Sequence, residues 1–209
     1  EGIETQERLS WRRYWLVDPL DGTKEFVKRN GEFTVNIALI ENGYPVMGIV
    51  HVPVTGVSYL GIKQMAEQVA GAWKIDAAGI SKAIHSRTCQ QSNELAVVAS
   101  RSHRGEILDK VLQELGTAFK GVEVVSMGSS LKICLVAEGK ADLYPRLAPT
   151  CEWDTAAAHA VLAGAGGEIV TTDFQPLRYN QKDELLNPFF IVLGDTEFSW
   201  DELLLPLLQ

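Results

Sequence analysis

The pair Asn42-Gly43 separates two runs of branched and apolar residues, 34–40 and 45–52, and this arrangement strongly constrains the fold. Asn-Gly between two β-prone runs is a strong signal of a β-hairpin, because both residues tolerate the positive φ that a tight turn requires. Further β-rich runs follow at residues 57–60 and 72–75. The first third of the chain is therefore predicted to form an antiparallel sheet.

After about residue 94 the pattern changes to short strands that alternate with helices. In chain order we predict a strand at 95–99, a helix at 105–115, a strand at 122–126, a helix at 130–138, a strand at 141–144, a helix at 154–162 and a strand at 168–170. Such alternation indicates a parallel or mixed sheet with helices on its faces. We expect two parts, residues 1–85 and 86–209, with a ligand cleft between them.

A short apolar and aromatic run at residues 14–17 predicts a buried strand that ends in a turn at Asp18-Pro19. The next residues complete the motif Asp-Pro-Leu-Asp-Gly-Thr, with Asp18 and Asp21 three positions apart. Because Pro19 restricts the backbone, both carboxylates and the Leu20 carbonyl can point at one cation that prefers oxygen ligands. Alternatively, the two Asp side chains only cap backbone amides, as Asp does in many loops. The spacing does not match an EF-hand.

Asp154 stands at the start of a predicted helix that is rich in small residues. An Asp at this place is typical of an N-cap. It is equally suited to complete a metal site from the second half of the chain. The spacing leaves both interpretations open.

Composition and charge narrow the classes of partner. The formal net charge of −8 argues against a nucleic-acid polymer as ligand, since such proteins usually carry a basic face. Cys89, Cys134 and Cys151 do not form a disulfide framework or a zinc motif, which favours reduced thiols in the cytoplasm. No run of residues approaches a membrane span, although peripheral attachment to the inner membrane stays open. Trp200 and the apolar tail after it predict core packing or a homodimer contact.

Two separated motifs resemble a known family. Residues 14–26, which end in Thr-Lys-Glu-Phe, and residues 153–157 resemble the two signatures of the inositol-monophosphatase superfamily. That ending, together with residues 128–132, resembles the 3'(2'),5'-bisphosphate nucleotidase branch. The resemblance implies a layered α/β/α/β/α sandwich of the inositol-monophosphatase and sugar-phosphatase type, with the antiparallel sheet first and a mixed sheet second.

The resemblance also implies the site. Asp18, the Leu20 carbonyl, Asp21 and Asp154 would hold two or three Mg²⁺ ions, while Gly22 and Thr23 would contact the phosphate that is removed and Thr23 would orient the attacking water. Two-metal hydrolysis would follow. The remaining positions implied to hold the second phosphate, ribose or base are Ser100, His103, Ser129, Lys132 and Arg146. From the residues alone, the alternatives are that Lys132 is a surface lysine and that His103 is solvated ahead of the helix that starts near Gly105.

The implied activity is removal of the 3'-phosphate from adenosine 3',5'-bisphosphate, the by-product of sulfate activation. An inositol or other sugar monophosphatase is the alternative within the same enzyme class. A calcium-stabilised structural domain is a weaker alternative of another class. By the resemblance, Glu1 would be the second residue of a Glu-Glu pair whose first member binds metal, and an Asp that polarises Thr23 would lie further upstream. On that expectation the chain is a fragment, which leaves open a nucleotide-binding remnant without activity.

Overall fold

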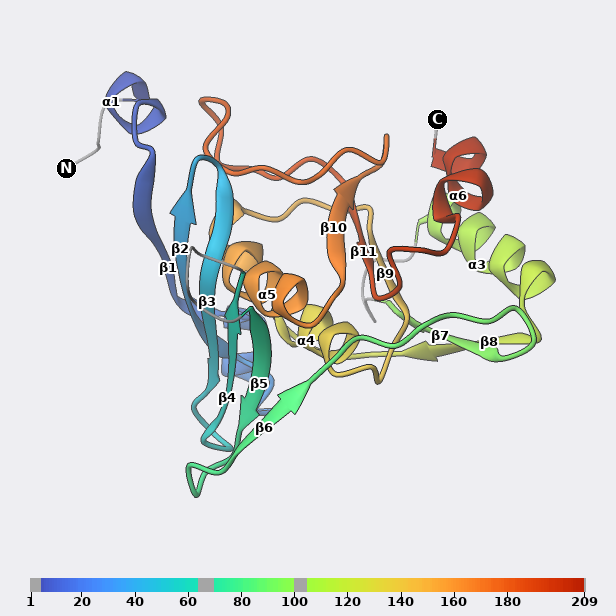
Figure 1. Cartoon of the computed structure of the whole chain (residues 1–209), viewed down its shortest axis with the longest axis horizontal. Coiled ribbons are helices and arrows are strands. Elements are labelled where there is room, and N and C mark those ends of the chain that lie inside the picture. The colour runs from blue at the N-terminus through green and yellow to red at the C-terminus, as the bar shows by residue number, and fades with distance from the viewer. Residues whose placement is uncertain (1–4, 64–69, 100–104, 209) are drawn as a thin grey trace.

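The computed structural model describes residues 5–63, 70–99 and 105–208, which fold into two β-sheets with helices between and beside them (Figure 1). The strands are β1 (Arg13–Asp21), β2 (Thr34–Glu41), β3 (Tyr44–Val52), β4 (Val57–Ile62), β5 (Gly71–Ile75), β6 (Ser81–Ile84), β7 (Glu94–Val98), β8 (Gly121–Val125), β9 (Leu143–Arg146), β10 (Glu168–Thr171) and β11 (Phe190–Leu193). The helices are α1 (Thr5–Leu9), α2 (Thr23–Lys28), α3 (Glu106–Ala118), α4 (Leu131–Ala137), α5 (Glu152–Gly164) and α6 (Trp200–Leu208).

The first sheet is antiparallel throughout, with the strands in the order β1-β2-β3-β4-β5-β6. The predicted hairpin is confirmed: Asn42 and Gly43 connect β2 to β3, and their φ angles of 51° and 82° are both positive. The edge strand β6 was missed, because it lies in a polar stretch and only Ile84 of its four residues is buried.

The prediction for the first strand was partly wrong. β1 is an edge strand that continues through Pro19 to Asp21, and Trp15 and Val17 are 56% and 48% exposed rather than buried. Among the described strands β1 lies at the edge of the sheet, and Pro19 falls in an irregular stretch of its pairing, which are places where a residue without an amide hydrogen is tolerated. The pairing register with β2 shifts between Asp18 and Asp21, which indicates a bulge at the motif.

The second sheet is mixed, with the order β10-β11-β9-β7-β8. β7 is parallel to both β8 and β9, whereas β11 is antiparallel to β9 and β10. The predicted fold class, with an antiparallel sheet first and a mixed sheet second, is thereby confirmed. A division at residues 85 and 86 remains a proposal, because α5 comes from the second half but packs against the first sheet.

The layers alternate along the molecule. Helices α4 and α5 lie between the two sheets, and α3 and α6 cover the opposite face of the second sheet (Figure 1). Trp200 and Leu204 of α6 are almost fully buried there, so this part of the apolar tail packs into the core. No helix in the described part of the chain is long and apolar enough to cross a membrane.

A row of small residues lets α5 approach the first sheet closely. Neighbouring positions across β2, β3, β4 and β5 hold Ala38, Gly48, Gly61 and Ala72. A Cβ atom on Gly48 would lie 2.2 Å from the Ala157 carbonyl oxygen, and one on Gly61 would lie 2.2 Å from the Cα of Val161. The backbone of α5 therefore rests directly on the backbone of the sheet, which fixes the position of its N-terminus.

Candidate metal centre and phosphate pocket

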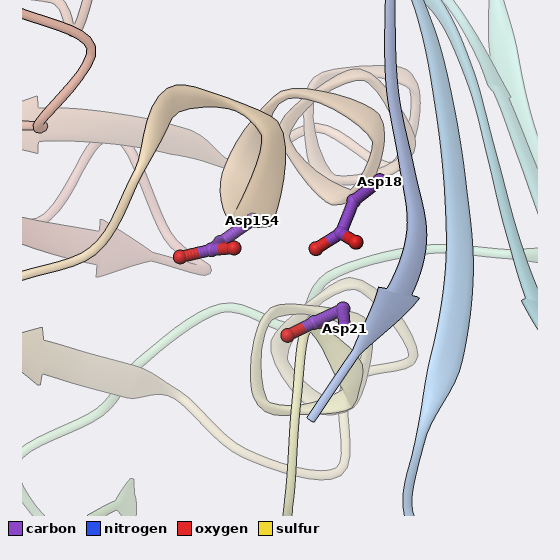
Figure 2. A group of neighbouring side chains, drawn as sticks. All are labelled: Asp18, Asp21 and Asp154. Atoms are coloured by element: carbon purple, nitrogen blue, oxygen red, sulfur yellow. The ribbon is translucent and has the colours of Figure 1, made fainter. Parts of the chain in front are cut away.

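The first two carboxylates of the site lie at the end of β1. The bulge places Pro19 and Leu20 between Asp18 and Asp21, and both side chains turn toward the N-terminus of α5 (Figure 2). The Leu20 amide donates a hydrogen bond to Asp18 Oδ1 at 2.9 Å. The local turn thus fixes the orientation of the buried Asp18 carboxylate.

The third carboxylate comes from α5. The interpretation of Asp154 as N-cap is wrong, because the helix begins two residues earlier and Cys151 is the capping residue. Asp154 occupies the third helical position, and its Oδ2 accepts a hydrogen bond from the Cys151 amide at 2.8 Å. This is the acidic half of a capping box, which holds the side chain at the helix start.

The three carboxylates converge. Asp18, Asp21 and Asp154 each present an oxygen within 4.8 Å of the others (Figure 2). Burial, together with the Asp21 and Asp18 carboxylates, raises the pKa of Asp154 to about 6, and burial raises the pKa of Asp21. Three acceptor-only groups in one place repel each other unless a cation lies between them. Oxygen ligands of this kind fit a hard divalent cation, so the residues present suit a metal site.

Asp21 is held by further polar side chains that the sequence interpretation missed. Its Oδ2 accepts hydrogen bonds from the Ser130 amide at 2.6 Å, from Thr34 Oγ1 at 3.2 Å and from Asn36 Nδ2 at 3.2 Å. Ser130 Oγ in turn donates to Asn36 Oδ1 at 3.0 Å. These three residues are at most 3% exposed, so water competes little for the hydrogen bonds. The sequence did contain a signal for two of these residues, because the alternation along β2 puts Thr34 and Asn36 on the inward face of the strand.

A pocket of about 220 Å³ adjoins the carboxylates. The predicted residues that line it are Asp21, Gly22, Ser129, Lys132, Arg146 and Asp154. Lys132 is half-buried and lines this pocket, and burial and the nearby Arg146 lower its pKa to about 8. Ser129 Oγ and Arg146 Nε are buried and have no hydrogen-bond partner among the described residues. Such unpartnered donors next to a lysine are suited to bind an anion.

The other predicted residues lie less directly at the pocket. Leu20 and Thr23 are near the carboxylates in sequence, but neither is among the described residues that line the pocket. Gly22 caps α2 with φ 87° and ψ 46°, a left-handed conformation that glycine adopts readily. Ser100 and His103 lie outside the described residues.

Known proteins share both the motifs and the fold. The model of the inositol monophosphatase family matches residues 1–207. The 3'(2'),5'-bisphosphate nucleotidase CysQ of Escherichia coli (strain K12) is 50% identical over 185 residues, which cover 88% of this chain and 70% of the relative. CysQ of Haemophilus influenzae is 38% identical over 199 residues, covering 95% of this chain and 70% of the relative.

A solved structure agrees with the sequence comparisons. The crystal structure of CysQ from Bacteroides thetaiotaomicron, described as a bacterial member of the inositol monophosphatase family, has a TM-score of 0.83 and 44% identity. The similarity covers 94% of this chain and 75% of that one. The chain therefore belongs to the inositol monophosphatase family.

Proposed function

We propose that the protein removes the 3'-phosphate of adenosine 3',5'-bisphosphate, giving AMP and phosphate, in a reaction that depends on Mg²⁺. The observation that carries the proposal is the convergence of three carboxylates beside a pocket lined by two half-buried cationic side chains, Lys132 and Arg146. The bisphosphate nucleotidase activity in the name of relatives that are up to 50% identical supports the choice of substrate.

In this proposal Asp18, Asp21, Asp154 and the Leu20 carbonyl hold two or three Mg²⁺ ions. When bound, such ions activate water and stabilise the charge on the leaving oxygen. Each of the three Asp residues has one oxygen committed to a backbone amide, of Leu20, Ser130 and Cys151 respectively. The second oxygen of each carboxylate is then oriented for a ligand before any ligand arrives, which lowers the entropic cost of assembling the site.

The scissile phosphate is proposed to bind at the start of α2. The amides of Thr23 and Lys24 belong to the first turn of this helix and find no partner within it. They can donate to a phosphate oxygen, and the left-handed Gly22 brings the chain into that turn. The exposed hydroxyl of Thr23 is proposed to hydrogen-bond the attacking water.

The second phosphate and the ribose are proposed to bind at Ser129, Lys132 and Arg146. Lys132 supplies a point charge, and Arg146 supplies a planar fork that can hold a phosphate through two parallel hydrogen bonds. Roles for Ser100 and His103 remain predictions. The cytoplasmic location and a homodimer also remain predictions.

The test is release of inorganic phosphate from adenosine 3',5'-bisphosphate and from inositol 1-phosphate, each with and without Mg²⁺. We expect Mg²⁺-dependent release from the nucleotide at a much higher kcat/KM than from inositol phosphate. The reverse preference would instead identify an inositol or sugar monophosphatase. Binding of the nucleotide without any release of phosphate would identify a non-catalytic remnant. Tight Ca²⁺ binding without affinity for the nucleotide would identify a structural domain.

A pair of variants isolates the metal site. Asp18→Asn keeps an oxygen that can accept from the Leu20 amide but removes the charge. We expect its kcat/KM to fall by more than the ~10–100-fold that loss of an outer-shell partner costs in metal sites. Asp109→Asn makes the same change at an exposed position of α3 and should leave activity unchanged. Equal activity of both variants would refute the assignment of Asp18.

A further inference from the structure

A buried asparagine connects two segments of the chain beside the phosphate pocket. Asn187 lies three residues before β11 and is only 8% exposed. Its backbone amide donates to the Thr150 carbonyl at 2.8 Å, and Cys151 pairs with Leu186 in an isolated antiparallel bridge. The segment before β11 therefore runs alongside the residues that lead into α5.

The side-chain amide of Asn187 contacts three oxygens of that neighbouring segment. Its Nδ2 donates to the Cys151 carbonyl at 2.8 Å, to Thr150 Oγ1 at 3.1 Å and to Thr155 Oγ1 at 3.1 Å. A carbonyl oxygen can only accept, so the contact with Cys151 identifies the nitrogen as the end of the amide that points here. The Oδ1 atom of Asn187 is buried without a partner in the described part of the chain, so the side chain is held by its donor end alone.

Two of these acceptors, Thr150 and Thr155, belong to residues that line the phosphate pocket, but only one of them has a hydrogen to spare. Thr155 Oγ1 also accepts from the Tyr179 hydroxyl at 3.2 Å and donates to the Glu152 carbonyl at 3.2 Å. A hydroxyl group has one hydrogen and two lone pairs. The Thr155 hydroxyl is thus fully used within the protein and anchors the first turn of α5.

The Thr150 hydroxyl is placed differently. It accepts from Asn187, and no acceptor for its own hydrogen is found among the residues that the structure describes. Because the Asn187 amide occupies a lone pair of the oxygen, the hydrogen has to point away from Asn187. Thr150 follows Pro149, whose carbonyl accepts from Arg146 Nη2 at 3.0 Å, so the hydroxyl belongs to a segment that Arg146 also holds. In a pocket lined by Arg146 and Lys132, such a hydrogen is suited to an anionic oxygen.

We propose that Asn187 is a positioning residue of the phosphate pocket, which holds the Thr150 hydroxyl so that its hydrogen is free to donate to a phosphate oxygen of the substrate. The proposal rests on the proposed function for the identity of the anion. Asn187 is not among the described residues that line the pocket, so it acts through Thr150 and not by touching the substrate.

The first experiment measures binding of adenosine 3',5'-bisphosphate by calorimetry without Mg²⁺, when the proposed reaction does not proceed. Thr150→Val removes the hydroxyl and keeps the branched shape of the side chain. We expect its Kd for the nucleotide to rise about 10–100-fold, the size of effect expected for one hydrogen bond to a charged group. Thr117→Val makes the same change at an exposed position of α3 and should leave the Kd unchanged. An unchanged Kd in Thr150→Val would overturn the proposal.

A second variant tests whether Asn187 acts through Thr150. Asn187→Leu replaces the amide by an apolar group of similar shape, and we expect the Kd for the nucleotide to rise about tenfold, because the Thr150 hydroxyl is no longer held. The double variant should bind the nucleotide no more weakly than Thr150→Val alone, since residues that act through one contact are not additive. Additive losses would overturn the positioning role. A lower urea midpoint in Asn187→Leu with the parent's Kd would show a purely structural role and would also overturn it.

The remaining outcomes separate this proposal from the proposed function. If Asn187→Leu does not fold, Thr150→Val still decides, because an unchanged Kd in that variant leaves Asn187 nothing to position. A parent protein that binds the nucleotide but releases no phosphate with Mg²⁺ would refute the proposed function, while weaker binding in both variants would support the roles of Thr150 and Asn187. A parent protein that binds the nucleotide neither with nor without Mg²⁺ would overturn both proposals.

Discussion

The close contact between α5 and the first sheet predicts the effect of one methyl group. In Gly61→Ala, the new Cβ would lie 2.2 Å from the Cα of Val161 and 2.4 Å from the Ala160 carbonyl oxygen. Both are backbone atoms, so no side chain can rotate away, and Gly61 has no positive φ that alanine would resist. Ordinary contact begins near 3.4 Å, so the helix has to move by roughly 1.2 Å. Overpacking of this kind costs about 1–3 kcal/mol of unfolding free energy.

The same movement should reach the metal centre. Asp154 lies about two turns N-terminal to Val161 on α5, and a helix moves largely as a rigid body. A displacement of about 1 Å in a catalytic group can cost on the order of 100-fold in rate. We therefore expect Gly61→Ala to lower the urea midpoint and also to weaken Mg²⁺ binding and phosphate release by about tenfold or more.

The matched control is Gly116→Ala on α3, where a Cβ would meet nothing within 4 Å. That change should stabilise the protein by about 0.5–1 kcal/mol, because alanine favours a helix interior over glycine. If the urea midpoint of Gly61→Ala equals that of the parent, the packing argument is wrong. If it is less stable yet binds Mg²⁺ as the parent does, the position of α5 does not control the site.

Three further predictions concern buried polar groups. Because the pKa of Asp154 is raised to about 6, its neutral form stabilises the metal-free fold at low pH, and this contribution is lost as pH rises through about 6. Mg²⁺ binds the ionised form of Asp154, so the Kd for Mg²⁺ should rise about tenfold for each pH unit below 6. A Kd for Mg²⁺ that does not depend on pH in calorimetry would contradict this prediction. Asn36→Ala removes one hydrogen-bond donor to Asp21 and should weaken Mg²⁺ binding about 10–100-fold, while the circular dichroism spectrum stays unchanged. An unaltered Mg²⁺ affinity would show that the hydrogen bonds to Asp21 are not needed for metal binding. Asp142→Ala removes the acceptor for the Arg87 side chain at 2.5 Å and for the Ala96 amide at 2.7 Å, and it should lower the free energy of unfolding in urea by about 2–4 kcal/mol. Glu41→Ala, in the more exposed ion pair with Arg13, should lower it by at most about 1 kcal/mol. Equal losses in the two variants would contradict the role of burial.

The parts of the fold that were predicted from sequence are those with a local signal. The Asn42-Gly43 hairpin has its own turn chemistry, and the alternation of strands and helices between residues 94 and 171 was visible in the sequence. The missed elements lack such a signal. β6 is polar with one buried residue, β11 is buried at all four positions and shows no alternation, and α2 is a six-residue helix directly after a turn motif. Short elements of this kind are determined by tertiary contacts rather than by propensity.

For the candidate site, the sequence located the groups but not their arrangement. The two Asp motifs were recognisable, whereas their convergence depends on how far α5 approaches the first sheet. That distance is determined by Gly48 and Gly61, which in a linear sequence are only two small residues within strands. The polar cluster around Asp21 was missed for a similar reason, because Asn36 and Ser130 meet only after the sheet and α4 have packed together.

Capping and metal binding, which the sequence presented as alternatives, are compatible in the structure. Asp154 Oδ2 accepts from the Cys151 amide while the carboxylate also faces Asp18 and Asp21 (Figure 2). Asp154→Asn and Asp154→Ala separate the two roles. Asparagine keeps the cap and relieves the repulsion, so without metal it should be at least as stable as the parent. Alanine loses the cap and should be about 1 kcal/mol less stable than the asparagine variant in urea unfolding. Both should lose Mg²⁺ affinity, and an asparagine variant that binds Mg²⁺ like the parent would leave capping as the only role of Asp154.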